Sequence, residues 1–507
     1  MLSRVRTVAF NGLETLNVEL QTQISSGLPS FTIVGLPDKA VAESKERIRA
    51  AFCSLGIKLP PKRITVNLAP ADIVKEGTHY DLPLALGILS GMGLISQEKL
   101  SYYIVVGEVG LDGALIRVNG VLPAAVKAAK ENMGFICPFE QGGEAAWSDG
   151  KDIVPAKNIE QLINFFQGTV EIEKPVALQT ETCAAQLDMS DVKGQESAKR
   201  ALEIAAAGGH NLIMVGPPGS GKSMLAARLP TILPPMERDE ALETSMIASV
   251  AGELNGTSLI FDRPFRAPHH SASTPALVGG GRPARPGEIS LANNGVLFLD
   301  EFPEFARPTL EALRQPLETG KVNISRVNSH VEFPAKIQLI AAMNPCRCGF
   351  LGNPARECAR APRCAQEYQA KISGPLLDRI DIQIEVPAVS PWDMAKTATG
   401  ESSAEIRKRV IAARKIQQAR FCAFGYDNLH TNSQLSGDLL EKSVPMNDDA
   451  KELLLNYANR VKLSARGYNR TLKLARTIAD LQNEIKLHRI HIAEALSLRW
   501  KAPDYKI

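Results

Sequence analysis

The sequence of 507 residues contains no long hydrophobic run. No uninterrupted apolar stretch approaches the roughly 18–20 residues that span a membrane, and residues 1–6 lead into alternating strand-like residues rather than an apolar signal segment. Cysteine is also scarce, with eight residues in the chain. Four of them are clustered, which excludes a disulfide scaffold. We therefore expect a cytoplasmic protein with no membrane partner.

An excess of one charge is also lacking, because the net charge is only +3. The balance is uneven along the chain: residues 395–507 carry 20 Lys and Arg against 12 Asp and Glu, whereas residues 1–170 carry 16 against 17 and residues 171–394 carry 22 against 26. A basic C-terminal region is compatible with a polyanionic partner, and equally with an ordinary solvated helix surface. The length predicts roughly three domains.

A glycine-rich stretch follows the apolar run 212–215 and precedes a predicted helix at 224–229. Its residues are Gly216, Pro217, Pro218, Gly219, Ser220, Gly221, Lys222 and Ser223. This order matches G-x-x-x-x-G-K-[ST] between a strand and a helix, the context of a phosphate-binding loop. The glycines let backbone N–H groups converge on phosphates, Lys222 reaches the β- and γ-phosphates, and Ser223 ligates Mg²⁺. The chain is predicted to hydrolyse a nucleoside triphosphate.

Two further apolar runs end in polar residues. Residues 296–299 have the pattern of a buried parallel strand and lead into Asp300 and Glu301. We expect Asp300 to hold Mg²⁺ through water and Glu301 to polarise the attacking water. The run 337–343 ends at Asn344, which we expect at the tip of a neighbouring strand.

The stretch before the phosphate loop is Asp-Val-Lys-Gly-Gln (191–195), followed by an Ala-rich helix at 196–207. It resembles the element of AAA+ ATPases that receives the adenine, which implies ATP as the nucleotide. The resemblance places Val192 on the base, and we expect His210 to close the pocket.

Residues 1–170 alternate strand and helix signals, including a predicted hairpin between 103–106 and 114–118. They resemble the Lon-protease-like domain found at the N-terminus of magnesium-chelatase-like proteins. The resemblance is carried by 66–70 (Val-Asn-Leu-Ala-Pro), 75–77 (Lys-Glu-Gly), 81–85 (Asp-Leu-Pro-Leu-Ala) and 106–109 (Val-Gly-Glu-Val). The places of the protease's serine and lysine fall at about His79 and Pro123, which supply neither a hydroxyl nucleophile nor an amine base. We expect a structural or interaction domain without peptidase activity, in which a packed or surface His79 is favoured over an acid–base role.

An unusual segment, 263–282, contains Arg266, the adjacent His269 and His270, and three consecutive glycines. It shows no hydrophobic period and predicts a flexible basic loop facing a partner. Metal binding by the two histidines is disfavoured because no third ligand lies nearby in the sequence. Together with 286–292 and the Asp300 strand, the segment closely resembles the ComM/YifB group of magnesium-chelatase-like AAA+ proteins. There it forms an insertion in the second helix of the core that projects toward the pore of a ring.

After the Asp300 strand, residues 311–318 predict one helix that ends at Gly320. Residues 322–326 and 330–333 then predict two strands, which resemble the hairpin that pore-threading relatives insert into the central channel. Lys321 and Arg326 are the candidates for contact with a phosphate backbone. The alternative is a solvent-exposed hairpin without such a role.

Four cysteines lie within nineteen positions: Cys346, Cys348, Cys358 and Cys364. Four thiolates in a loop rich in Gly, Pro and Arg suggest a structural Zn²⁺ site. The spacing is irregular for a familiar zinc finger, and free or redox-linked cysteines are the alternative.

Residues 373–381 resemble the element of magnesium chelatases and related helicases that carries an arginine finger. By that resemblance Arg379 enters the neighbouring subunit's active site, against the alternative of a local pair with Asp378 or Asp381. Residues 395–507 predict helices at 403–421, 450–461, 470–487 and 491–500. By similarity to the chelatase lid, Arg466 is sensor 2, with Arg470 as the second choice.

The sequence thus predicts an α/β multidomain protein. The parts are a Lon-protease-like domain (1–170), a linker (171–190), an AAA+ P-loop core with a parallel sheet, flanking helices and a helix-2 insert (191–394), and a helical lid (395–507). The resemblance implies a homo-hexameric, ATP-driven DNA motor for helicase or branch-migration work during natural transformation. A protein-remodelling ATPase of the magnesium-chelatase type is the alternative, and an ATP-dependent protease is disfavoured by His79 and Pro123.

Overall fold

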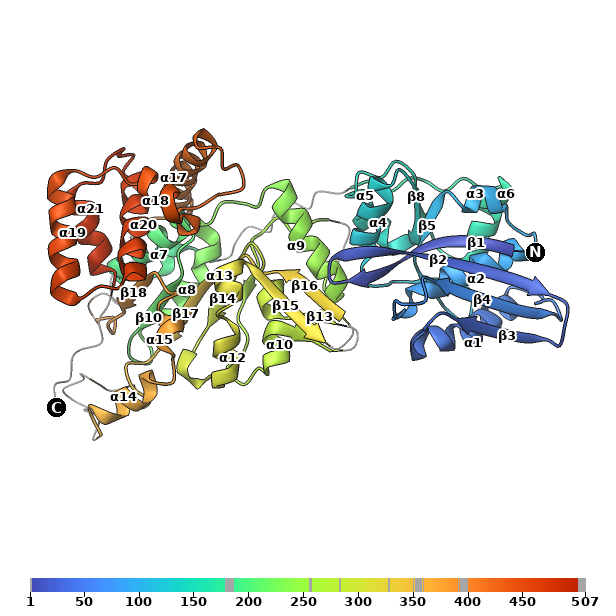
Figure 1. Cartoon of the computed structure of the whole chain (residues 1–507), viewed down its shortest axis with the longest axis horizontal. Helices are drawn as coiled ribbons and strands as arrows, with labels where there is room; N and C mark the ends of the chain where they lie inside the picture. The colour runs from blue at the N-terminus through green and yellow to red at the C-terminus, as the bar shows by residue number, and fades with distance from the viewer. Residues whose placement is uncertain are drawn as a thin grey trace.

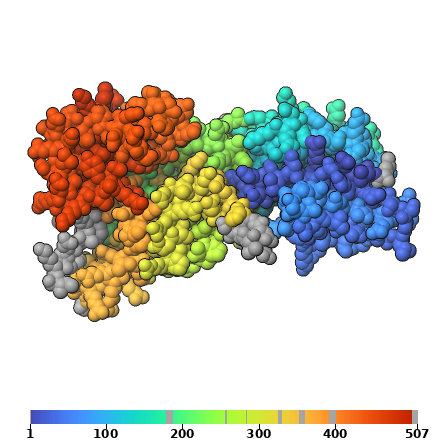
Figure 2. Space-filling view, in the orientation of Figure 1, coloured from blue at the N-terminus to red at the C-terminus, as the bar shows by residue number. Residues whose placement is uncertain are grey.

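The computed structural model of the chain describes residues 2–177, 187–254, 258–281, 284–326, 329–349, 351, 358, 360–390, 392 and 400–499. Three parts lie in a row: an N-terminal α/β domain, a central α/β core and a C-terminal helical region (Figure 1). The space-filling view shows the same three masses, with the core in the middle (Figure 2). Among the described residues, no helix is long and apolar enough to cross a bilayer.

The N-terminal domain is built on a mixed seven-stranded sheet in the order β3-β4-β2-β1-β5-β8-β9. Alternate residues of β1 point to opposite faces, so Val5 packs into one apolar cluster and Val8 into the other. The strands are β1 (Leu2–Asn11), β2 (Glu14–Ser25), β3 (Ser30–Val34), β4 (Arg63–Ala69), β5 (Tyr103–Val105), β8 (Gly134–Pro138) and β9 (Ile153–Ala156). The helices are α1 (Lys39–Ser54), α2 (Asp81–Gly91), α3 (Gln97–Leu100), α4 (Val121–Lys130), α5 (Gly142–Ala146) and α6 (Ile159–Gln167).

The hairpin predicted in this domain has a different first strand. Residues 103–105 form β5, which pairs in parallel with β1 and β8 inside the main sheet. The hairpin joins β6 (Glu108–Val109) to β7 (Leu115–Ile116) instead. The prediction was wrong because Tyr103 to Val105 is apolar enough to form a central strand, and local turn chemistry did not reveal its distant partners.

The core contains a five-stranded sheet in the order β11-β14-β17-β10-β18, in which every pairing is parallel. Its strands are β10 (Leu212–Val215), β11 (Phe265–Arg266), β14 (Val296–Leu299), β17 (Gln338–Met343) and β18 (Ile382–Glu385). Both faces are covered: Leu212 and Met214 pack toward α7 (Glu196–Gly208) and α8 (Lys222–Ile232), while Ile213 and Val215 belong to the opposite apolar cluster. The prediction of a parallel sheet with flanking helices is confirmed.

The segments inserted between these strands are more ordered than the sequence predicted. The segment 263–282 includes β11, α10 (Thr274–Val278) and β12 (Gly279–Gly280), and it follows α9 (Arg238–Ala251). β12 pairs with β13 (Arg285–Pro286), which leads to α11 (Glu288–Leu291). The prediction of a loop without secondary structure was therefore wrong, because two-residue strands and a five-residue helix are too short to show a period.

Two short helices stand where one was predicted after the Asp300 strand. These are α12 (Arg307–Ala312) and α13 (Pro316–Thr319), and Pro316 explains the interruption because it cannot donate an amide hydrogen bond inside a helix. α13 ends at Gly320, whose φ of 67° suits a helix terminus. The predicted hairpin is present as β15 (Lys321–Arg326) paired with β16 (Ser329–Pro334). Two more short helices, α14 (Arg363–Gln369) and α15 (Gly374–Leu377), precede β18.

The C-terminal region is helical, as predicted. Its helices are α17 (Ser403–Ala423), α18 (Gly437–Ser443), α19 (Asp448–Val461), α20 (Ala465–Leu481) and α21 (Arg489–Ser497). Ser402 caps α17 in a reciprocal arrangement with Glu405, and Ser464 caps α20. α17 and α20 share an apolar cluster with α7 and α8, so the helical region closes one face of the core.

Candidate active site

The phosphate-binding loop lies between β10 and α8, as predicted. Gly219 and Gly221 have φ values of 75° and 88°, which a residue with a side chain rarely adopts. A Cβ atom on Gly216 would lie 2.1 Å from the carbonyl oxygen of Val386. These glycines therefore fix the path of the loop, which places its successive backbone groups at the N-terminus of α8. A helix N-terminus of this kind is suited to bind phosphate.

Lys222 begins α8 and turns back over the loop. Its Nζ lies 2.8 Å from the carbonyl oxygen of Gly216, 2.9 Å from that of Pro217 and 3.4 Å from Oγ of Ser220. Burial lowers the pKa of Lys222, and the charge of Asp300 opposes that shift. The ammonium group is thus held at the mouth of the loop, where the phosphates of a nucleotide would meet it.

The two predicted magnesium ligands are in contact. Ser223 Oγ donates a hydrogen bond of 2.7 Å to Oδ2 of Asp300, at the end of β14. Oδ1 of Asp300 accepts a hydrogen bond of 2.8 Å from the backbone amide of Glu301, which orients the carboxylate. A hydroxyl and a carboxylate side by side are oxygen donors of the kind that Mg²⁺ takes beside a bound phosphate, so the residues fit this ion.

Asn344 follows β17, the strand between β14 and β10 in the sheet. Its Oδ1 lies 3.4 Å from Nζ of Lys222, so the structure brings the third strand tip to the same place. The phenol of Tyr368 is hydrogen-bonded to the backbone of Asn344, which anchors this tip from α14.

Glu301 occupies a strained turn directly after Asp300. Its φ of 50° is in the left-handed region, which is uncommon for a residue with a side chain. Its Oε2 lies 2.9 Å from Nδ1 of His270, which comes from the insert after α9. His270 was predicted at the pore, and the sequence gave no reason to connect it with Glu301.

The adenine end is less complete. Val192 is 1% exposed and lies just before α7. The side-chain amide of Gln195 donates to the carbonyl oxygens of Ser220 and Pro387, which ties this segment to the phosphate loop. The prediction that His210 closes the pocket was wrong: it precedes β10, at the end of the strand away from the phosphate loop. There it contacts Asp381 and Thr477.

Family models describing magnesium chelatase subunit ChlI match residues 20–141 and 188–394, and a model of its C-terminal region matches 400–499. The chain is 44% identical to "Competence protein ComM" of Haemophilus influenzae, with 98% of this chain and 97% of that protein covered. It is 42% identical to "Uncharacterized protein YifB" of Salmonella typhimurium, with the same shares covered. The chain belongs to the magnesium-chelatase ChlI family.

Within this family the chain is a ComM-like AAA ATPase, and the family implies ATP and Mg²⁺. A more distant relative is "Magnesium-chelatase 67 kDa subunit" of Heliobacterium mobile, 23% identical over 45% of this chain and 38% of that protein. The phosphate loop, Asp300, Glu301 and Asn344 lie together in the structure and belong to the part that the chelatase model matches.

Arg379, the predicted arginine finger, lies at the other end of the core sheet. Its carbonyl oxygen accepts a hydrogen bond from Asn211, the residue before β10. The four residues of β10 separate this point from the phosphate loop by about 13 Å at about 3.3 Å per residue. The guanidinium donates to Oε2 of Glu318 at 2.5 Å and to the carbonyl oxygen of Pro375 at 2.7 Å. The local pair expected with Asp378 or Asp381 is therefore made with Glu318 instead.

Arg466 is exposed in the first turn of α20. Its positive charge helps to lower the pKa of Glu318, after the hydrogen bond and charge of Arg379. The two predicted arginines thus act on one carboxylate. Arg470, the second choice for sensor 2, donates a hydrogen bond of 2.6 Å to Asp381.

The four clustered cysteines come together in space. Their sulfur atoms all lie within 4.8 Å of one another, and Cys346 is buried. Tetrahedral Zn–S bonds of about 2.3 Å put sulfur atoms about 3.8 Å apart, so the arrangement fits one zinc ion. Burial raises the pKa of the Cys346 thiol. Gly349 within this segment lies against Pro218, so the cluster is next to the phosphate loop.

The predicted polymer-binding residues differ in their surroundings. Arg266 pairs with Glu288 at 2.7 Å and with Glu253 at 3.0 Å, so its charge is matched within the protomer. Lys321 pairs with Glu332 at 2.7 Å on the exposed hairpin. His269 is exposed and contacts Ser271. The backbone of Arg326 ends β15, and its side chain lies outside the described residues.

The counterpart of a protease dyad is a packed region. His79 is 5% exposed, its Nε2 lies 2.9 Å from the carbonyl oxygen of Val8, and its ring stacks near Phe10 and Tyr80. Burial lowers the pKa of His79 to about 4. Pro123 is buried in α4. The packed histidine that the sequence favoured is confirmed.

Proposed function

We propose that this chain is a ring-forming, ATP-driven DNA motor of the ComM type, which unwinds or branch-migrates DNA during recombination in natural transformation. The proposal rests first on the ATPase site, where Lys222, Ser223, Asp300 and Asn344 meet within hydrogen-bonding reach. Full-length similarity to a protein named for competence supports the choice of DNA as the load. The motor would be a cytoplasmic homo-hexamer.

Each group of the site has a distinct task in hydrolysis. The backbone of 216–221 and the ammonium of Lys222 bind the phosphates, and Ser223 with Asp300 orients Mg²⁺, which neutralises phosphate charge when bound. Glu301 accepts a proton from the attacking water, and Asn344 orients that water. Each role needs a side chain at the carboxyl end of a parallel strand, and β10, β14 and β17 supply these ends side by side.

The ring follows from what one protomer lacks at its own phosphate loop. Arg379 lies across the sheet from that loop, so it serves a neighbour's nucleotide, and Arg466 on the same side assists it. Lys321 and Arg326 on the β15–β16 hairpin, with His269, are the proposed DNA contacts. Arg266 is a weaker candidate because two carboxylates already neutralise it.

The remaining parts have supporting roles. We propose that Cys346, Cys348, Cys358 and Cys364 bind a structural Zn²⁺ ion. The N-terminal domain, which resembles the Lon-protease fold, is proposed to be an interaction domain without peptidase activity, in keeping with the buried neutral His79. Protein remodelling is the second candidate function, favoured by the partial match to a magnesium-chelatase subunit.

The decisive experiment measures ATP turnover of the full chain with and without forked or single-stranded DNA, together with displacement of a labelled strand. We expect DNA to stimulate turnover. Glu301→Gln should abolish displacement by removing the base that accepts the water proton, yet retain DNA binding. Removing such a base lowers the rate by about 10²–10⁴-fold.

Glu304→Gln is the matched control, because Glu304 lies one turn further and pairs with Lys371. It should leave turnover close to that of the unaltered protein. Absence of both DNA stimulation and salt-sensitive DNA binding would reject the DNA motor. Stimulation by a protein partner in place of DNA would favour the remodelling function.

A further inference from the structure

The contact between His270 and Glu301 joins the insert to the catalytic carboxylate. Nδ1 of His270 lies 2.9 Å from Oε2 of Glu301. An ionised carboxylate only accepts hydrogen bonds, so Nδ1 must carry the proton and donate it. In the part of the chain that the structure describes, Glu301 makes no hydrogen bond or ion pair to the side chains of Lys222, Ser223 or Asn344. Its carboxylate is thus engaged by the insert and not by the phosphate-binding residues.

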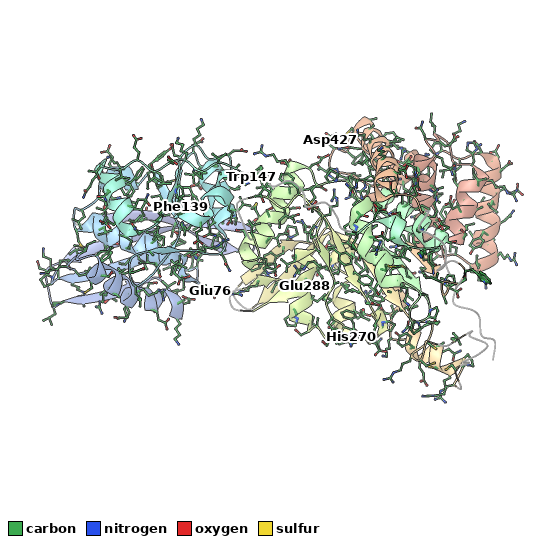
Figure 3. The ribbon with its side chains drawn as sticks, turned by 180° about the vertical axis from the view of Figure 1, so that it is seen from behind. Glu76, Phe139, Trp147, His270, Glu288 and Asp427 are labelled. Atoms are coloured by element: carbon green, nitrogen blue, oxygen red, sulfur yellow. The ribbon has the colours of Figure 1, made fainter. Side chains whose placement is uncertain are left out.

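The position of His270 in the chain gives this contact its meaning. β11 pairs with β14 at the edge of the core sheet, and His270 follows β11 by four residues just as Glu301 follows β14 by two. Beyond His270 the chain continues through α10 and the three consecutive glycines at 279–281 into the β12–β13 pair. Figure 3 labels His270 at the margin of the core, away from the N-terminal domain. A displacement of the insert would therefore be passed directly to Glu301.

The imidazole of His270 is also held from its other side. Its ring lies against that of His269, with centroids 4.1 Å apart and an angle of 34° between the planes. His269 in turn contacts Ser271 through Nδ1 at 2.8 Å, and its side chain is exposed. The exposed His269 is thus one ring away from the histidine that holds Glu301, so a molecule that displaces His269 disturbs the contact.

The sign of the effect follows from the chemistry of a general base. A donor fixed on Oε2 occupies a lone pair that the attacking water would otherwise use, and it holds the carboxylate toward the insert. We propose that His270 is a latch on Glu301, which restrains hydrolysis until a polymer bound at the insert moves the histidine away. This deepens the proposed function, since it takes Glu301 to be the base of ATP hydrolysis and names the residue that regulates it.

The latch is tested with His270→Ala in the full-length protein. Loss of the donor should raise kcat for ATP without polymer by about two- to fivefold, the range expected for a half-exposed ion pair. KM for ATP should stay unchanged, because no phosphate contact is removed. The stimulation ratio with single-stranded DNA should fall toward one. A fall in kcat, or an unchanged kcat with an unchanged ratio, would overturn the latch.

Two further variants separate the latch from a loss of folding. His270→Asn places an amide donor near the position of Nδ1 and should restore the low basal rate, whereas Ser271→Ala, on an exposed neighbour without contact to Glu301, should not raise it. In a Glu301→Gln background, His270→Ala should have no effect on the residual turnover. An increase there would also overturn the proposal, since the latch acts only through the carboxylate.

The outcomes distinguish this proposal from the proposed function. If DNA fails to stimulate the unaltered protein, the DNA motor is rejected, yet the basal kcat of His270→Ala still decides whether His270 restrains Glu301. If DNA stimulates the unaltered protein and His270→Ala to the same extent, the motor stands and the latch fails.

Discussion

Asp381 is a buried carboxylate that joins the core to the helical lid. It accepts hydrogen bonds from Arg470 in α20 at 2.6 Å and from His210 at 3.3 Å, while His210 also contacts Thr477 of the same helix. Burial alone would raise the pKa of Asp381, but the hydrogen bond from His210 and the charge of Arg470 lower it to about 2. The carboxylate is therefore ionised throughout the physiological range and stabilises the joint.

Asp381→Asn should destabilise the protein by roughly 2–3 kcal/mol at pH 7, as expected for a carboxyl pKa lowered by almost two units. A lowered pKa means that this stabilisation is present above the unfolded pKa of about 4 and is lost as the pH falls toward 2. Denaturant unfolding of the two proteins at pH 7 and at pH 3 should show the gap narrowing at low pH. Asp378→Asn, on an exposed neighbour, is the control, and a gap independent of pH would contradict the assignment.

The residues that the sequence located correctly are those whose partners are encoded in one continuous motif. Lys222 and Ser223 meet their targets because the loop, the strand and the helix are consecutive. Glu301 was recognised through its position after Asp300, but its contact with His270 was not, since no periodicity links an insert to a strand tip. Arg379 shows the same limit: its partner Glu318 lies 61 residues away.

At the scale of elements, the cysteine-bearing segment between β17 and α15 supports the active site. Gly349 lies against Pro218 of the phosphate loop, and Gln369 of α14 donates to the carbonyl oxygen of Pro345 at 2.9 Å. Tyr368 of the same helix is hydrogen-bonded to the backbone of Asn344. A metal ion that fixes this segment would thereby fix both the phosphate loop and the third strand tip.

Removal of zinc should weaken nucleotide binding more than it lowers the maximal rate. Protein purified without chelator should contain about one equivalent of zinc, as four thiolates in tetrahedral reach predict. Treatment with a strong chelator should raise KM for ATP severalfold and expose α14 to proteolysis, and Cys364→Ser should do the same. Cys422→Ser, on an exposed cysteine in α17, is the control. Less than about half an equivalent of zinc would reject the site.

The elements that the sequence predicted well are those with a strong period or a buried run. β10, β14 and β17 were located because each is a continuous apolar run, and α17 because it is long and carries a capping box. The short pieces failed: β6 and β11 are two residues long, so their register depends on neighbours and not on their own composition.

At the scale of the whole molecule, the N-terminal domain is fixed to the root of the insert. Glu144 accepts a hydrogen bond of 2.6 Å from Ser249 of α9, and Arg117 donates to the carbonyl oxygen of Leu254 at 3.0 Å. Trp147 lies at this junction in Figure 3, and its ring packs edge-on against Phe261. Because α9 leads into the segment that carries His270, a force on the N-terminal domain reaches the same insert that contacts Glu301.

The active site is completed only between protomers if Arg379 acts on a neighbour. Lys222→Ala and Arg379→Ala should each lose most ATP turnover alone, since an arginine finger contributes about 10³–10⁵ in rate. Mixed in equal amounts, they should regain up to about a quarter of the normal turnover, because one interface in four then joins an intact Lys222 to an intact Arg379. Assembly of the mixture is checked by light scattering in the presence of nucleotide.

The control mixes Lys222→Ala with the double variant Lys222→Ala/Arg379→Ala, which offers no complete interface and should regain nothing. If the first mixture stays as inactive as its parts while forming rings of normal size, Arg379 does not act in trans. Its pairing with Glu318 would then be structural, with the finger elsewhere. Recovery would instead mean that Glu318 releases Arg379 when the ring closes, which connects the end of α13 and the adjacent β15–β16 hairpin to hydrolysis at the neighbouring site.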